Sequence, residues 1–184
     1  MKMSAKRVVL LMGLVLLLDA NLVWAADPVD DTAKANVTVT VNTIMEWSAA
    51  SYTDITLTPI AAQSDDPEGS TNFTLYTNGD VHITADITTA AQLTLGADPN
   101  QTLVTSYMLK DNGDGTNTTG GDDETDYTLY SSFLSSPAYA IIHVAGDGAD
   151  VITLWAKAEN PSGEVADAGV YSATQTLTAS WGNP

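Results

Sequence analysis

The chain has 184 residues and is strongly acidic, with 23 Asp and Glu against 6 Lys and Arg and a formal net charge of −17. A charge of this sign opposes binding to nucleic acid and to anionic lipid. The length is typical of a single domain, and because there is no cysteine the fold must depend on packing or on partner subunits rather than on disulfides.

Residues 1–25 have the features of a secretory signal peptide. Three basic residues precede a short apolar run, residues 8–18, which is brief for a membrane span. We expect cleavage after Ala25, with an uncleaved anchor as the alternative. The mature chain would keep three lysines against 22 acidic residues, a net charge of −19, and would be secreted with no membrane span.

The mature chain begins with a segment that alternates in polarity. Val37, Val39 and Val41 would share one face of a strand over residues 36–42, with Ala35 in the same phase. We therefore expect an N-terminal extension over residues 26–43, followed by a single β-domain over residues 44–184.

Further short segments with β-type alternation follow, separated by Gly, Asn, Asp and Pro and without helical periodicity. They predict strands at residues 53–58, 72–77, 80–88, 92–96, 102–109, 127–131, 138–144 and 150–158. The dipeptide Asn78-Gly79, between two of these segments, predicts a tight β-hairpin.

The segment 111–126 is acidic, polar and rich in Gly, so it cannot form a core strand. Its simplest interpretation is a surface insertion. A calcium loop is the alternative, because Asn112, Asp114 and Thr116 alternate as the ligands of 12-residue calcium loops do. Lys110 stands at the first ligand position of that register and no Glu closes it, which makes the motif a poor match. No other cofactor is expected.

The last fifteen residues alternate and predict one long strand, 170–181, with one buried and one exposed face. The buried face would carry Tyr171, Ala173, Leu177, Ala179 and Trp181, and Ser and Thr dominate the other face. About ten strands in one domain predict an all-β, immunoglobulin-like β-sandwich, and a barrel is the alternative.

Residue types that serve catalysis are scarce. His82 and His143 occupy alternating positions of predicted strands, where a structural role is more common than a ligand or base. Common nucleophile, zinc and phosphate-loop motifs are missing, so we expect no enzyme activity. Trp47, Trp155 and Trp181 lie within or at the end of strands and are interpreted as core anchors; a carbohydrate-binding surface is the alternative.

Three segments of the chain carry a resemblance to a known family. They are Lys34-Ala-Asn-Val-Thr-Val-Thr-Val-Asn-Thr43, the Thr-Asn and Gln-Leu-Thr elements within residues 76–94, and the aromatic-Ser strand within residues 169–181. Each resembles the corresponding segment of the cysteine-free major pilins of chaperone–usher fimbriae, of the colonization-factor (alpha) and common-pilus types. The resemblance covers roughly a third of the mature chain, and the acidic loop and the scarcity of Lys depart from it.

The resemblance implies a sandwich that lacks one edge strand and is completed by donor-strand exchange. A periplasmic chaperone and an outer-membrane usher would assist assembly, and the next copy of the chain would insert Ala35, Val37, Val39 and Val41 beside the terminal strand. The product would be a cell-surface homopolymer that supports adhesion or biofilm formation. Two alternatives remain: residues 33–42 pair within their own chain, or the protein is a monomeric carbohydrate- or calcium-binding module.

Overall fold

The computed structural model describes residues 34–111, 124–135, 138–143, 146 and 148–182. The chain divides into two units, Met1–Val41 and Asn42–Pro184. In the first unit, the described residues 34–41 contain no helix or strand, and their side chains are exposed. The strand predicted for residues 36–42 is therefore not formed. A strand is held by the ladder that it makes with a neighbour, and residues 34–41 have no such neighbour among the described strands.

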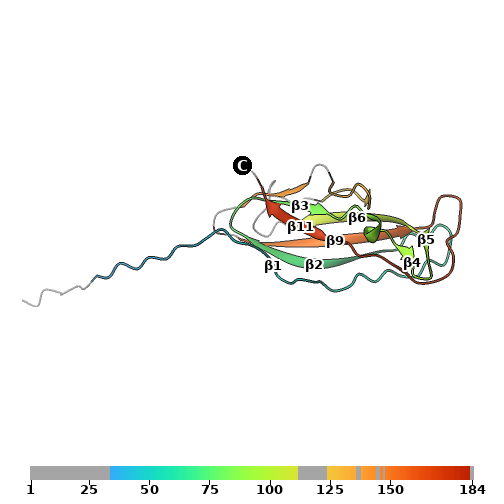
Figure 1. Ribbon diagram of the computed structural model, residues 1–184, viewed down its shortest axis with the longest axis horizontal. Helices are drawn as coiled ribbons and strands as arrows, with labels where there is room; N and C mark the ends of the chain where they lie inside the picture. The colour runs from blue at the N-terminus through green and yellow to red at the C-terminus, as the bar shows by residue number, and fades with distance from the viewer. Residues whose placement is uncertain (1–33, 112–123, 136–137, 144–145, 147, 183–184) are drawn as a thin grey trace, which may run out of the picture. The chain divides into compact units, whose positions relative to one another are not determined.

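The described part of the second unit, called the domain below, forms three antiparallel sheets (Figure 1). In spatial order, sheet A contains β1 (Met45–Trp47), β2 (Glu68–Thr77), β9 (Ala149–Glu159), β6 (Val104–Asp111) and β7 (Thr128–Leu129). Sheet B contains β11 (Leu177–Trp181), β3 (Val81–Ala85) and β8 (Tyr139–Ile141). Sheet C contains β10 (Tyr171–Ser172), β4 (Thr94–Leu95) and β5 (Asp98–Thr102), and a short 3₁₀ turn, η1 (Thr89–Ala91), precedes it. The all-β prediction is confirmed, and the arrangement is compatible with an immunoglobulin-like β-sandwich.

The hydrophobic core lies between sheets A and B. Sheet A contributes alternate residues of its three long strands, and sheet B contributes residues of β3 and β8. The buried apolar side chains of these five strands are Phe73, Leu75, Tyr107, Leu109, Ile152, Leu154, Ala156, Val81, Ile83 and Ile141. Strand β9 shows why the sequence pattern predicts this core. Its even-numbered residues are buried and its odd-numbered residues are half-buried, as expected for a central strand with one face on the core.

The predicted hairpin at Asn78-Gly79 is wrong. The turn joins β2 of sheet A to β3 of sheet B, and these two strands do not pair with each other. The end of β2 already has a neighbour on each side, because Met45–Trp47 and Ala149–Asp150 both pair with it there. The chain therefore crosses to the other sheet after Thr77.

The terminal segment is also different from the prediction. It contains two strands in different sheets, β10 in sheet C and β11 in sheet B. Residues 173–176 cross between the sheets, and the Thr174 N–H donates to the carbonyl of Ala90 at 2.8 Å. Burial still alternates at every residue from 171 to 180, so the faces follow the sequence pattern although the strand does not continue.

Other differences concern short or unpaired segments. Residues 53–58 do not form a strand, although Ile55 and Leu57 approach Gly69 of β2. Strands β1 and β5 are absent from the prediction. The proposed calcium ligands Asn112, Asp114 and Thr116 lie outside the described residues.

Candidate strand-acceptor edge

Strand β11 stands at the edge of sheet B. It pairs with β3 over five positions, from Leu177 opposite Ala85 to Trp181 opposite Val81. On its other side no described strand pairs with it (Figure 1). We call this side of β11 the open edge. An unpaired strand edge presents backbone donors and acceptors to any extended segment that approaches it.

The hydrogen-bond phase shows which residues face the open edge. Two bonds that flank the ladder, from the Asp86 N–H to the Thr176 carbonyl and from the Gly182 N–H to the Asp80 carbonyl, are both 2.8 Å long. In an antiparallel pair, residues that exchange bonds with the partner alternate with residues whose bonds point away. The even-numbered residues of β11 therefore face β3, and the N–H and carbonyl groups of Leu177, Ala179 and Trp181 face the open edge.

Apolar side chains beside the open edge are incompletely covered. Leu177 and Ala179 pack against the core but remain half-buried. On the neighbouring strand β3, Ile83 (opposite Ala179) and Val81 (opposite Trp181) are buried. A second set of half-buried side chains packs on the same core from the start of the domain: Met45, Trp47, Tyr52 and Ile55. A further apolar segment at the open edge would bury more of Leu177 and Ala179.

The predicted acceptor row is divided by the crossing between sheets. Tyr171 pairs with Leu95 in sheet C, and Ala173 lies in the crossing, so only Leu177, Ala179 and Trp181 belong to β11. Trp181 was expected to be buried, but 43% of it is exposed. Its ring lies over the turn, since a Cβ at Gly79 would come within 3.1 Å of its Cζ3 atom.

The predicted donor residues are all exposed. The side chains of Val37, Val39 and Val41 have exposed fractions of 91%, 87% and 69%, and Ala35 is exposed as well. Three large apolar side chains, spaced by two, are thus exposed within a short segment. Apolar residues that a chain leaves in water in this periodic way are available to a partner.

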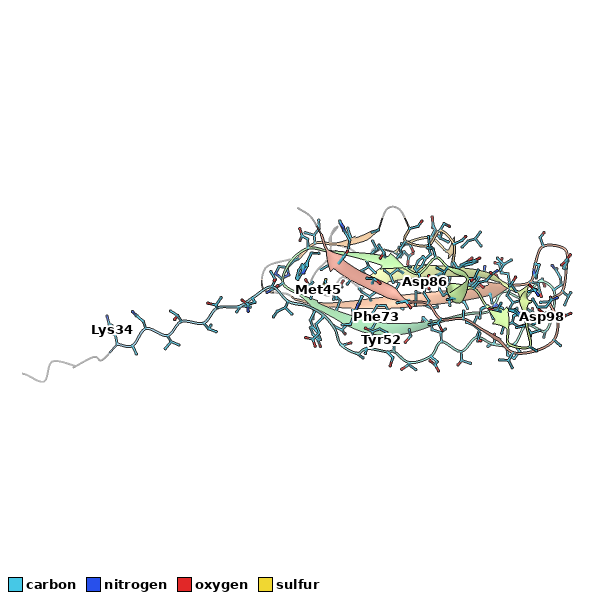
Figure 2. All side chains as sticks on the ribbon, viewed as in Figure 1. Lys34, Met45, Tyr52, Phe73, Asp86 and Asp98 are labelled. Carbon is cyan, nitrogen blue, oxygen red and sulfur yellow. The ribbon has the colours of Figure 1, made fainter. Side chains whose placement is uncertain are left out.

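Three aromatic residues near the start of the domain pack against one another. Trp47 makes edge contacts with Phe73 and Tyr52, at centroid distances of 5.2 and 6.4 Å, and Figure 2 shows Tyr52 and Phe73 beside each other. Burial raises the pKa of Tyr52. Trp155 is half-buried in the central strand β9. Trp47 therefore fits the interpretation as a core anchor, whereas Trp155 lies on the face of β9 opposite the buried residues Leu154 and Ala156.

The histidines and acidic residues do not assemble into a metal centre within the described ranges. His82 is exposed on β3 opposite Ser180. His143 is half-buried beyond β8, and its backbone N–H donates to Asp80 Oδ1 at 2.9 Å. Among the described residues, no helix has the length and hydropathy to cross a membrane.

Sequence reasoning missed the role of Asn78. Its side chain and backbone bond to residues 42 and 44, which immediately follow the segment of exposed valines. These contacts join positions more than thirty residues apart, which local patterns such as the Asn-Gly pair do not report.

Comparisons with known proteins place few constraints on the chain. No protein-family model and no curated protein matches it. One of the matching solved structures is described as a chaperone–tip adhesin complex in the biogenesis of CFA/I fimbriae. That match has 15% sequence identity and a TM-score of 0.39, and it covers 75% of this chain. This chain spans only 42% of the length of that chain.

Proposed function

We propose that this protein is the structural subunit of an extracellular filament, in which the exposed segment of one copy adds a strand to the open edge of the next. The observation that carries the proposal is the phase of β11. The outward-facing backbone groups belong to Leu177, Ala179 and Trp181, and the first two direct half-buried apolar side chains toward the core. An added strand would satisfy the backbone groups and cover these side chains together.

The donor segment has the chemistry that such an edge requires. Alternating Val and Thr give one apolar and one polar face, and β-branched residues favour extended backbone. Burying each valine contributes about 1.5–3 kcal/mol, or about 5–9 kcal/mol for Val37, Val39 and Val41 together. Main-chain hydrogen bonds along the ladder add to this value. Such a joint would be durable chiefly because its dissociation is slow.

The proposal assigns the remaining features accordingly. Residues 1–25 would direct secretion, residues 26–43 would be the donor extension, and residues 44–184 would form the acceptor domain. A chaperone would protect the open edge before assembly, because an unpaired apolar edge aggregates. The role is structural and non-enzymatic, and the filament would support adhesion or biofilm formation.

Polarity changes in the extension test this proposal. We expect Val37→Asp with Val39→Asp to abolish filaments of the mature chain, because two carboxylates would have to be buried at the edge. The matched control is Thr38→Asp with Thr40→Asp, which adds the same charge to the opposite face and should leave filaments intact. Electron microscopy and size-exclusion chromatography measure the outcome. Filaments of normal yield from the valine variant would contradict the proposal, as would their loss in both variants.

A further inference from the structure

The turn between β2 and β3 connects four parts of the domain. Together, Thr77, Asn78, Gly79 and Asp80 contact residues in four separate segments: 42–44, 143, 148 and 181–182. The Thr77 N–H donates to the Gly148 carbonyl at 2.9 Å, Gly79 lies under the ring of Trp181, and the Asp80 carbonyl accepts from Gly182 at 2.8 Å. The turn itself is held by Thr77, whose buried hydroxyl donates to the Gly79 carbonyl at 2.7 Å.

Asn78 binds the start of the domain through three hydrogen bonds, which we call the Asn78 clamp. Its Oδ1 accepts from the Ile44 N–H at 2.7 Å, and its own N–H donates to the Ile44 carbonyl at 3.2 Å. Its Nδ2 donates to the Asn42 carbonyl at 2.9 Å. All three partners are backbone groups, so the clamp fixes the chain path of residues 42–44 rather than any side chain.

The clamp continues the line of β1. Met45 pairs with Thr77, and the clamp places Ile44 opposite Asn78, one position further along the same antiparallel ladder. Asn42, the residue that follows Val41, therefore lies at the end of β2. The ring of Trp181 packs on Gly79 at the same turn, so β11 also ends here. Figure 1 shows β1 and the end of β11 at the same end of the domain, and Figure 2 labels Met45 there.

This placement distinguishes two ways in which the open edge can be filled. An extension that binds its own β11 would have to reverse at residues 42–44, and it would then run parallel to β11, because it ends near Trp181. An extension from another copy can bind in the antiparallel direction, which is slightly more favourable per residue. The Asn78 clamp opposes the reversal, because residues 42–44 cannot turn back without breaking it.

We propose that Asn78 is the positioning residue that directs the extension to another copy of the chain and away from the open edge of its own domain. This inference rests on the proposed function and adds to it a determinant of intermolecular over intramolecular exchange. The partner is a second copy of this chain, and the recognised element is its open edge.

The test compares three full-length mature variants with the wild type. Asn78→Asp keeps the acceptor for Ile44 but places a second oxygen against the Asn42 carbonyl, and Asn78→Ala removes both side-chain bonds. Asn100→Asp is the matched control: it makes the same substitution in β5, where the Asn100 side chain bonds only locally to Asp98. Chromatography gives the ratio of monomer to polymer, and hydrogen exchange gives the protection of the Leu177 and Ala179 amides in the monomer.

We expect Asn78→Ala to raise the ratio of monomer to polymer about tenfold, because it loses two hydrogen bonds. Asn78→Asp loses one hydrogen bond and gains a repulsive contact with the Asn42 carbonyl, so it should raise the ratio as well. In both monomers the Leu177 and Ala179 amides should be newly protected. The Asn100 variant should behave as the wild type. A rise in monomer without that protection would show simple destabilisation and would overturn the inference, as would an unchanged ratio. If the wild type itself forms no polymer, the proposed function fails together with the inference; wild-type polymer with unchanged Asn78 variants contradicts the inference alone.

Discussion

Tyr107 shows how a single buried polar group is satisfied inside this core. Its ring is buried in β6, and its hydroxyl donates to the carbonyl of Ala91 at 2.7 Å. Burial, with a smaller effect from the charge of Asp86, raises the pKa of Tyr107 from 10.0 to about 12. The hydroxyl thus joins η1 to sheet A and stays protonated in the folded protein.

Tyr107→Phe should destabilise the domain by about 1–3 kcal/mol, because it leaves the buried Ala91 carbonyl without its donor. The pH dependence has a definite sign. The unfolded chain loses the tyrosine proton first, so the stabilisation from Tyr107 is complete below pH 10 and is lost as the pH rises through about 12. The difference in stability between wild type and variant should therefore shrink over this range.

Urea unfolding at a series of pH values measures this difference. Tyr76→Phe is the control, because Tyr76 is exposed on β2 and its replacement should change stability by less than about 0.5 kcal/mol. A constant difference between wild type and the Tyr107 variant from pH 9 to pH 12 would contradict the assignment of the raised pKa.

Charged side chains on sheet A illustrate residue-scale contacts that the sequence does not reveal. Lys157 Nζ lies 2.9 Å from Asp66 and 2.8 Å from Glu159. Hydrogen bonds to these carboxylates raise the pKa of Lys157, and the contact with Lys157 lowers the pKa of Asp66. Composition predicts only a net acidic surface, whereas the structure shows one of its few cations fully engaged in local pairs.

Among the secondary-structure elements, the long strands of sheet A were predictable and the connections were not. Strands β2, β6 and β9 alternate over eight or more residues, so their period of two is evident from the sequence. β1 has three residues, too few for a periodic signal, and β5 begins Asp-Pro-Asn, which is typical of a turn. Alternation also cannot tell which sheet a strand joins, and that explains the unexpected break between β10 and β11.

The two sides of β11 should respond differently to proline. Proline has no N–H and is tolerated in a strand only where that group faces away from the ladder. Ala179→Pro removes an N–H on the open edge, so the domain should stay folded while filament formation is lost. Thr178→Pro removes an N–H that faces Thr84 of β3 and should destabilise the domain by about 1–3 kcal/mol.

Thermal unfolding and electron microscopy of both variants check this expectation. If Ala179→Pro assembles normally, the open edge does not receive a hydrogen-bonded strand. If Thr178→Pro leaves stability unchanged, the assignment of even-numbered residues to the β3 ladder is wrong.

At the scale of the whole molecule, the proposed strand exchange needs two segments of alternating residues, and each is visible in the sequence by itself. The valines at positions 37, 39 and 41 and the apolar residues of the terminal segment are both visible as patterns. The sequence does not reveal which backbone groups of β11 face outward or where residues 42–44 lie relative to β11. Both depend on contacts such as those of Gly79 with Trp181 and of Asn78 with Ile44. Such contacts arise only when distant segments fold together, and therefore no local pattern predicts them.

The central claim is that the extension of one copy occupies the open edge of another. Because the chain has no cysteine, single introduced thiols can report this contact without background. Val39→Cys is placed in one population of mature chains and Ala179→Cys in a second, and the two are mixed, assembled and mildly oxidised. Val37→Cys and Val41→Cys sample the other positions of the register, and Thr38→Cys and Thr40→Cys sample the opposite face.

A disulfide forms when the two Cα atoms lie about 4.4–6.8 Å apart with suitable side-chain directions. We predict that at least one of the three valine positions becomes linked to position 179 of a different chain, as identified by mass spectrometry, and that the two threonine positions do not. The claim would be contradicted if no link forms between the mixed populations. A separate double variant with Val39→Cys and Ala179→Cys in the same chain serves as a control, and a link found only inside that single chain would show that the extension binds its own domain.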